Sequence, residues 1–246
     1  MRDIADYTQK YYKEPGEHYQ ALYRKKLILD VMKKYSHSSI LEIGCGLDPL
    51  FTHFGDYQKM TVVEPSRDFY ENAVELSKEK KNVLCLKGFF GECVKASKLH
   101  KGENDYIILS SLLHELEDPK EILYDIWKIC MKDTVVHINV PNAKSIHRLL
   151  AVEMGVIDSI YQLSEQQIDM QRYHVFDIEK LSKMVSDCGF EIIEKGSYYP
   201  KFFSGSQMDK ILQNNIVSEK IFDGLYGLGK YLNEYGSEIY VNVRIK

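Results

Sequence analysis

Short β-rich runs alternate with helical patterns along most of the chain, and this alternation limits the possible folds more than any other feature. The runs predict strands at about 40–43, 60–64, 82–87, 105–110 and 134–140, in the stretch after Gly189, and at 238–245. Helical patterns occupy 66–80 and 119–131. Strands that alternate with helices usually pair in parallel, so we expect an α/β fold with a mostly parallel sheet of seven strands. The 246 residues suit one such domain.

Two stretches interrupt this rhythm. Residues 142–172 are amphipathic and helical with no strand pattern, which predicts a cap inserted after the fifth strand. Residues 200–236 form a second interruption before the last strand. Between them Asp177 is the expected N-cap of a helix and Gly189 its C-terminal stop. We therefore expect a main domain over 38–246 that carries two insertions.

The first 37 residues precede the first predicted strand and are rich in aromatic side chains. They are expected to form a helical segment. This segment would either fold over the site as a lid or pack on the sheet edge, and the sequence leaves both open. The side chains available for a lid are Tyr7, Tyr11, Tyr12, His18 and Tyr19.

The first strand runs into a glycine turn, "ILEIGCGLDPLF", which we expect to lead into a helix. Gly44 and Gly46 allow a ligand to approach the backbone, because glycine has no Cβ and tolerates positive φ. A pyrophosphate at this turn would need a third glycine and free N–H groups at a helix start. Asp48 adds a negative charge there and Pro49 has no N–H. The turn therefore favours a cofactor with no phosphate at this point.

Glu64 ends the second strand, about 20 residues after Gly44, where an acidic side chain often accepts hydrogen bonds from ribose hydroxyls. The order of strand, Gly-x-Gly turn, second strand and acid is more specific than the turn alone. The alternative is that Glu64 only caps the next helix, which would begin at Pro65 and Ser66. We expect the ribose-binding role.

The segments "ILEIGCG", "VVEPS", "DYIILSSLLHELEDP" and "YHVFDIEKLSKMVSDCGFEIIE" together resemble class I S-adenosylmethionine-dependent methyltransferases. The closest likeness is to the small-molecule branch that includes ubiquinone-type O-methyltransferases. It covers roughly residues 38–198. The resemblance implies a Rossmann-like, doubly wound fold with helical cap insertions. It also implies S-adenosylmethionine as the cofactor and S-adenosylhomocysteine as the product.

The resemblance also implies a cofactor site. Glu42, Gly44 and Gly46 would cradle the methionine half of the cofactor, and Glu64 would bind its ribose. The full expected set is Glu42, Gly44, Cys45, Gly46, Glu64, Pro65, Ser66, Phe89, Ser110, Ser111, Leu112 and Tyr19. The chain departs from the family pattern at Asp48, which replaces a turn glycine. It also departs at Phe89, which stands where an acid often meets the adenine amino group, so that Phe89 or Phe90 would stack on adenine instead.

The segment "SSLLHELEDP" follows the fourth strand at the edge of the sheet where open α/β folds place their sites. His114 is the first candidate base there, and His174 is a second. Each also has a structural interpretation: His114 starts a loop with Glu115 facing solvent, and His174 caps a helix or fills the core. The zinc motif H-E-x-x-H is not completed because position 118 is Asp118, so no metal is expected.

The predicted cap offers polar side chains for a substrate. Lys144, His147 and Arg148 fall at i, i+3 and i+4, so one helical face would present two cations and an imidazole to an anion. The alternative is a solvated helix face. The expected substrate-binding set is Asn142, Lys144, His147, Arg148, Arg172 and Tyr173. This set favours an acceptor that carries phosphate or carboxylate.

Charge and composition narrow the partners. The 32 basic and 36 acidic residues give a formal charge of −4 and form no long run of either sign, which disfavours duplex nucleic acid. No apolar stretch has the length of a membrane span or of a signal-peptide core, so we expect a cytoplasmic protein with no membrane partner. The five cysteines form no C-x-x-C pair and are expected to be buried thiols.

We therefore expect O-methylation of a small, anionic metabolite. "NAKSIHRL" followed by "YHVF" resembles methyltransferases of bacterial surface-polysaccharide and small-metabolite pathways, which implies a sugar, a nucleotide-linked precursor or a phosphoramidate-type substituent as acceptor. The alternative is a non-catalytic binding or scaffold protein of the same fold, motivated by Asp48 and Phe89. A nicotinamide oxidoreductase and an RNA methyltransferase are weaker alternatives. The 200–236 insertion would complete the acceptor pocket or form a homodimer surface.

Overall fold

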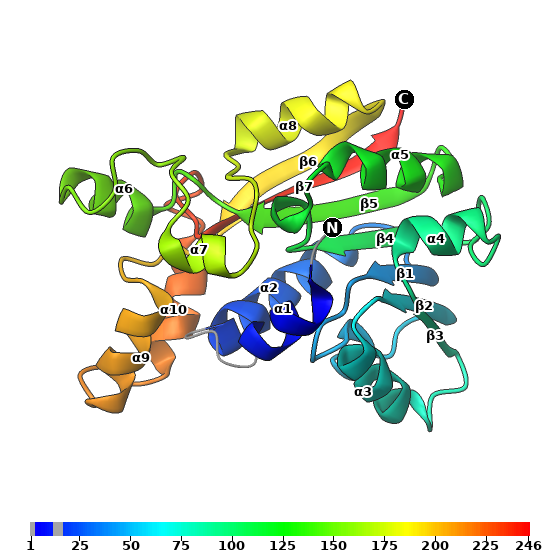
Figure 1. Cartoon of the computed structure of the whole chain (residues 1–246), viewed down its shortest axis with the longest axis horizontal. Coiled ribbons are helices and arrows are strands. Elements are labelled where there is room, and N and C mark those ends of the chain that lie inside the picture. The colour runs from blue at the N-terminus through cyan, green and yellow to red at the C-terminus, as the bar shows by residue number, and fades with distance from the viewer. Residues whose placement is uncertain (1–2, 12–16) are drawn as a thin grey trace.

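The seven expected strands form a single sheet in the computed structural model, which describes residues 3–11 and 17–246. They are β1 (Ser39–Ile43), β2 (Lys59–Glu64), β3 (Val83–Lys87), β4 (Tyr106–Ser110), β5 (Val135–Pro141), β6 (Phe190–Tyr198) and β7 (Glu238–Ile245). Their order is β3-β2-β1-β4-β5-β7-β6 (Figure 1). β7 is antiparallel to both neighbours and the other paired strands are parallel. The predicted doubly wound, mostly parallel sheet is confirmed.

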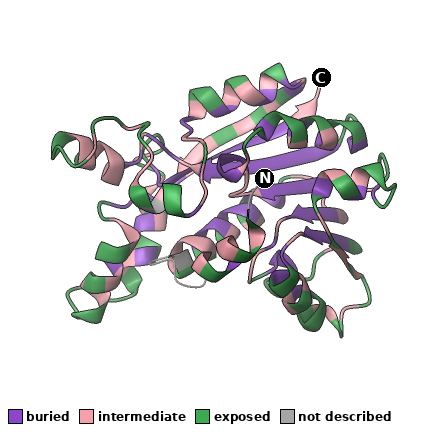
Figure 2. Cartoon of the chain, in the orientation of Figure 1, coloured by how far each residue is buried: buried purple, intermediate pink, exposed green. Residues whose placement is uncertain are grey.

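Helices cover both faces of this sheet. One face carries α4 (Phe90–Lys95), α5 (Pro119–Ile129) and α8 (Ile178–Asp187). The other carries α2 (Glu17–Met32) and α3 (Arg67–Ser77). Figure 2 shows the central strands buried between the two helical layers. Strands covered on both faces need apolar residues on both sides, which is why the sequence shows continuous apolar runs there.

The remaining helices lie before the sheet or between its last strands. They are α1 (Ile4–Tyr11), α6 (Ile146–Glu153), α7 (Glu165–Asp169), α9 (Gly205–Gln213) and α10 (Lys220–Leu228). The division into a lid segment, a cap and a second insertion stays a prediction, and Tyr12 lies outside the described residues. Within the described chain, no helix combines the length and the apolar character needed to cross a membrane.

The prediction of a helix directly after the glycine turn is wrong. A single 3₁₀ turn, η1 (Leu50–Thr52), takes its place. Pro49 has φ −58° and ψ 145°, so the backbone that enters η1 is extended rather than helical. The long helix α3 begins only after β2. The short helix α4 was not predicted from the sequence. It starts at Phe90, in the stretch expected to contact adenine.

Gly236 lies where the chain enters β7. Its replacement tests how closely this residue packs against β6. A Cβ on Gly236 would meet the backbone N and O of Tyr198 at 2.3 Å. Gly236→Ala should therefore lower the free energy of unfolding by roughly 1–3 kcal/mol, as overpacked sites do, in urea denaturation. The matched control is Gly224→Ala in α10, where a Cβ meets nothing within 4 Å. The control should be neutral or slightly stabilising, and equal effects of the two substitutions would contradict this packing.

Candidate functional site

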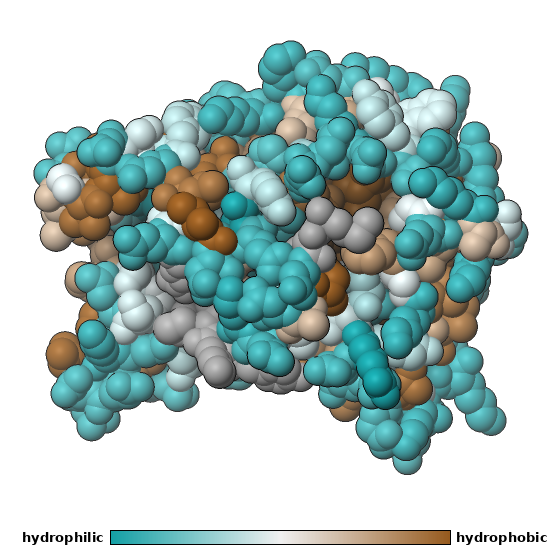
Figure 3. Space-filling view, in the orientation of Figure 1, coloured by the Kyte–Doolittle hydropathy of each residue, from teal (hydrophilic) through white to brown (hydrophobic). Residues whose placement is uncertain are grey.

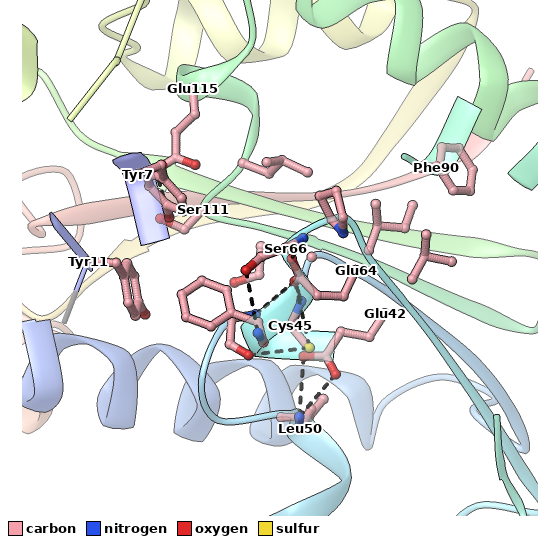
Figure 4. A pocket seen from close by; sticks show the side chains of 18 of the residues that line it. Tyr7, Tyr11, Glu42, Cys45, Leu50, Glu64, Ser66, Phe90, Ser111 and Glu115 are labelled. Atoms are coloured by element: carbon pink, nitrogen blue, oxygen red, sulfur yellow. Dashed lines mark hydrogen bonds between the residues drawn. The ribbon is translucent and has the colours of Figure 1, made fainter. Parts of the chain in front are cut away.

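A cavity of about 210 Å³ lies at the carboxyl ends of β1, β2 and β4, under the N-terminal helices α1 and α2 (Figure 4). Strand order reverses between β1 and β4, and open α/β sheets bind ligands at such a point. All predicted cofactor residues except Tyr19 line it: Glu42, Gly44, Cys45, Gly46, Glu64, Pro65, Ser66, Phe89, Ser110, Ser111 and Leu112. The structure thus brings predicted residues from four separate segments to one cavity.

Tyr19 does not join them. Its ring stacks on Phe222 of α10 with a centroid separation of 3.9 Å, and its hydroxyl donates to Glu219 at 3.2 Å. The expected cofactor contact of Tyr19 is therefore replaced by packing of α2 against α10. The sequence could not show this because the helix face that carries Tyr19 depends on where α10 docks.

The glycine turn has the backbone that the sequence predicts. Gly44 has φ +76° and Gly46 has φ +59°, conformations that cost a residue with a Cβ. The amide of Gly44 donates to the carbonyl of Val63 at 2.9 Å, which ties the turn to β2. The turn therefore presents its backbone to the cavity with no side chain in the way at these two positions.

Glu64 is the buried centre of the site. One carboxylate oxygen accepts hydrogen bonds from the amides of Cys45 at 3.1 Å and Gly46 at 3.3 Å, and the other accepts from the amide of Ser66 at 2.8 Å. Burial raises the pKa of Glu64 to about 7 in spite of these three donors. Ser66, not Glu64, caps α3, because its hydroxyl accepts from the amide of Phe69 at 3.4 Å. Glu64 thus lines the cavity and also supports the turn.

Glu42 is a second buried carboxyl at the cavity. Its two oxygens lie 3.0 and 3.3 Å from the amide of Leu50, which donates to them. Burial raises the pKa of Glu42 to about 7, and the neighbouring Lys25 opposes this shift. Two buried carboxyl groups beside one turn give the cavity a preference for a cationic ligand.

Asp48, the departure from the family pattern, is neutralised by its neighbours. Its carboxylate is paired with the ammonium of Lys25 from α2, and His53 Nε2 donates to it at 2.7 Å. Burial alone would raise the pKa of Asp48, but the hydrogen bonds from Lys25 and His53 hold it below the usual value. Asp48 therefore does not leave an uncompensated negative charge in the turn.

Helix α1 forms one wall of the cavity. Thr8 shares a hydrogen bond of 2.9 Å with the hydroxyl of Ser66, and the ring of Tyr11 packs edge-on against Phe69 at 5.5 Å between centroids. At its other side Lys10 pairs with Asp169 of α7 at 2.9 Å. Helix α1 thus connects the turn at the start of α3 with the stretch expected to be the cap.

Glu115 lies in the cavity, although the sequence interpretation left it facing solvent. It ends the 3₁₀ turn η2 (Leu113–Glu115), and its side chain is 5% exposed. The hydroxyl of Tyr7 donates to it at 3.4 Å, as Figure 4 shows. Successive residues of a 3₁₀ turn point about 120° apart, so Glu115 and His114 face different surroundings. No sequence signal distinguished the two.

The rings of the two predicted bases lie outside the described cavity lining. His114 is buried, and its Nε2 is 3.8 Å from a carboxylate oxygen of Glu115. His174 donates from Nε2 to the carbonyl of Glu117 at 3.2 Å and borders a separate groove. The structure does not bring these two imidazoles together, and their catalytic roles stay predictions.

Of the predicted substrate-binding residues, only Arg172 lines the cavity. Ser145 is the N-cap of α6, so Lys144 precedes the helix and the expected helical face is not formed. Lys144 instead pairs with Glu179 at 2.9 Å. Asn142 donates to backbone carbonyls at the entry to β7, and Tyr173 borders the separate groove.

His147 and Arg148 are also engaged within the chain. Arg148 donates to the carbonyl of Ile160 at 3.0 Å and to Gln162. Burial lowers the pKa of His147 to about 3, so its imidazole is neutral at pH 7. Lys144, His147 and Arg148 therefore do not form the expected helical face that would bind an anionic ligand. Within the described chain, no cluster of three or more histidine, cysteine or acidic side chains could hold a metal ion.

The sequence matches a family described as a methyltransferase domain over residues 16–195. No curated protein matches it. Solved structures share the fold at low identity. A methyltransferase from Thermotoga maritima, described as a possible histamine N-methyltransferase, is 16% identical with a TM-score of 0.61, over 94% of this chain and 91% of that one.

Two further structures extend the comparison. Phosphoethanolamine N-methyltransferase 2 of Haemonchus contortus, solved with S-adenosyl-L-methionine, is 18% identical with a TM-score of 0.60, over 89% of this chain and 52% of that one. The CurJ carbon methyltransferase is 14% identical with a TM-score of 0.53, over 90% and 52% respectively. Proteins of this fold thus methylate different kinds of atom, and the fold does not select the acceptor.

The buried carboxyl of Glu42 generates a pH-dependent prediction. Its pKa rises from 4.5 to about 7 on folding, so the folded state binds the proton more tightly and loses stability as pH rises through this range. Glu42→Gln removes the charge and should stabilise the protein by roughly 1–3 kcal/mol above pH 7, with little gain below pH 4.5. Thermal unfolding across this range measures the difference.

The matched control is Glu71→Gln on the exposed surface of α3, where Glu71 pairs with Arg67. It should leave the pH dependence nearly unchanged. A constant difference between Glu42→Gln and the wild type at every pH would show that Glu42 is not the titrating group.

Proposed function

The chain belongs to the S-adenosylmethionine-dependent methyltransferases, and from this premise we propose that it methylates an oxygen atom of a small, anionic acceptor held beside Glu115. The observation that carries the proposal is the cavity itself. Its one side is the glycine turn with Glu64, and its other side is the loop after β4 with Glu115. A cofactor on the first side and an acceptor on the second would meet inside it.

The cavity residues fit this cofactor. Gly44 and Gly46 leave room for the methionine half, and Glu64 has lone pairs left to accept hydrogen bonds from ribose hydroxyls. The carboxyl groups of Glu42 and Glu64 also favour a ligand that carries ammonium and sulfonium charges. Phe89 lines the cavity and is 40% exposed, so its ring is available to stack on adenine. When bound, the cofactor supplies a methyl group activated by the positive sulfur.

Glu115 is the side chain we propose as proton acceptor. The carboxylate of Glu115 would take the hydroxyl proton of the acceptor as that oxygen received the methyl group that the cofactor would supply. Tyr7 donates to the same carboxylate and helps to orient it. Much of the acceleration comes from holding acceptor, methyl and sulfur in line. His114 would act only through Glu115, because its Nε2 is 3.8 Å from that carboxylate.

Arg172 supports an anionic acceptor, because it is the cation from the 142–172 stretch that lines the cavity. A surface-polysaccharide precursor would satisfy this chemistry and stays a prediction from the sequence. The scaffold alternative is weakened, because Asp48 is neutralised and Phe89 leaves the cavity open.

We further propose that α1 acts as a lid, within an N-terminal segment of residues 1–37. Its contacts with Ser66 and Asp169 are polar, so water can replace them when the helix opens to admit ligands. In this proposal Tyr7 reaches Glu115 only when α1 is closed, so the acceptor side of the cavity is completed by closure.

Replacement of Glu64 tests the cofactor site. Glu64→Gln should weaken binding of S-adenosylhomocysteine by about 10- to 100-fold in calorimetric titration, because hydrogen bonds to a charged acceptor are lost. The control Glu71→Gln makes the same chemical change on the exposed face of α3 and should bind as the wild type does. Equal affinities for Glu64→Gln and the wild type would place the cofactor elsewhere.

Replacement of Glu115 tests the acceptor side separately. Glu115→Gln should reduce methyl transfer from labelled S-adenosylmethionine to the anionic small molecules of a cell extract by about 10²- to 10⁴-fold. Its affinity for S-adenosylhomocysteine should not change. Glu121→Gln, exposed on α5, is the control for the loss of one nearby charge. Full transfer activity in Glu115→Gln would remove Glu115 from the mechanism.

A further inference from the structure

A second hollow, which we call the basic groove, lies between the N-terminal part of α5 and α8. Its volume is about 390 Å³, and its lining includes Lys120, Lys180, Lys183, Tyr161, Tyr173 and His174. Only Tyr173 and His174 among these were singled out in the sequence. Figure 3 shows hydrophilic surface over α8, whereas hydrophobic side chains gather over α6. The groove lining joins these lysines and tyrosines to the apolar side chains of Val175, Phe176 and Met184.

The groove carries an excess of positive charge. Lys183 pairs with Asp187 at 3.0 Å, which neutralises one of the three ammonium groups. For Lys120 and Lys180 the described chain offers no carboxylate within ion-pair distance. Two acidic N-caps lie nearby and bind backbone amides rather than these ammonium groups: Asp118 accepts from the amide of Lys120 at 2.9 Å, and Asp177 accepts from the amide of Lys180 at 2.8 Å. Two ammonium groups are thus available to an anion.

Aromatic side chains lie among these cations. The ammonium of Lys180 lies 3.3 Å from the ring centroid of Tyr161, and this contact holds the lysine at the groove. Tyr161 is 38% exposed and Tyr173 is 42% exposed. Exposed tyrosine rings beside lysines suit a ligand that joins a flat ring to an anionic group.

One layer of backbone separates the groove from the catalytic cavity. Arg172 lines the cavity, while the next two residues, Tyr173 and His174, line the groove. The amides of Tyr173 and His174 donate to the carbonyl of His114 at 2.9 and 3.1 Å, next to Glu115. Consecutive Cα atoms are about 3.8 Å apart, so the two hollows are adjacent along this strip.

We propose that the basic groove binds the phosphate part of a nucleoside diphosphate-linked acceptor, whose methyl-accepting end enters the cavity past Arg172. The inference rests on the proposed function and names the substrate class for it. Lys120 and Lys180 bind the diphosphate, and the tyrosine rings contact the base. The proposed anion site is thus formed by α5 and α8, and not by the helical face of Lys144, His147 and Arg148 that the sequence predicted.

The probe for this groove is uridine 5′-diphosphate, titrated into the full chain in the presence of S-adenosylhomocysteine. The wild type should bind it more tightly than uridine. The double variant Lys120→Gln/Lys180→Gln should bind the diphosphate at least about tenfold more weakly. The control Lys95→Gln/Lys132→Gln removes two exposed lysines elsewhere and should bind as the wild type does. The proposal would be overturned if the wild type did not bind uridine 5′-diphosphate or bound uridine equally well. It would also be overturned if both double variants lost the same affinity for the diphosphate.

Two further measurements separate this inference from the proposed function. Binding of S-adenosylhomocysteine should be the same in the wild type and both double variants, because the groove is outside the cofactor cavity. If the wild type did not bind S-adenosylhomocysteine, the proposed methyltransferase function would be refuted, whereas the proposed anion binding in the basic groove would not. Treatment of a cell extract with a nucleotide pyrophosphatase, which cleaves the bond between the two phosphates, and then with a phosphatase should abolish methyl transfer to its anionic small molecules. Unchanged transfer after that treatment would refute a phosphate-bearing acceptor.

Discussion

The carboxylate of Glu64 joins three backbone amides from two separate segments, and the site is built around this contact. Cys45 and Gly46 belong to the turn after β1, whereas Ser66 begins α3. A buried carboxylate needs such donors, so the turn is held against the end of β2 and its glycines take positive φ. The raised pKa of Glu64, about 7, reflects the free-energy cost of burying this carboxylate in its charged form. In the proposed function, the ribose hydroxyls and the positive charge of the cofactor would offset that cost.

The neighbouring departure from the family pattern illustrates how the same turn tolerates a negative side chain. Asp48 would repel the two nearby carboxyl groups if it stood alone. Lys25 reaches it from α2, a helix that also covers the sheet, and His53 reaches it from the other side. Helix α2 therefore contributes charge as well as packing. A pyrophosphate would still lack the third glycine and the N–H that Pro49 does not have, whereas a cofactor without phosphate at this point needs neither.

Local patterns predicted what local physics controls. Buried strands follow from apolar runs, and the shared cavity follows from the strand–turn–strand order that brings Gly44 and Glu64 together. The failures depend on long-range packing or on one residue of register. Ser145 is the N-cap of α6, so the helix begins at Ile146 and Lys144 precedes it. The turn η2 directs Glu115 rather than His114 to the cavity. Neither outcome leaves a periodic trace in the sequence.

The most direct test of this account is a crystal structure of the chain with S-adenosylhomocysteine at a pH above the pKa of Glu64. The account predicts that both ribose hydroxyls donate to the Glu64 carboxylate, that the adenine lies against Phe89, and that Asp48 keeps its pairing with Lys25. The homocysteine sulfur should then face Glu115 across the cavity. A ligand bound elsewhere, or a ribose that makes no contact with Glu64, would contradict the central claim that this buried carboxylate organises the cofactor site.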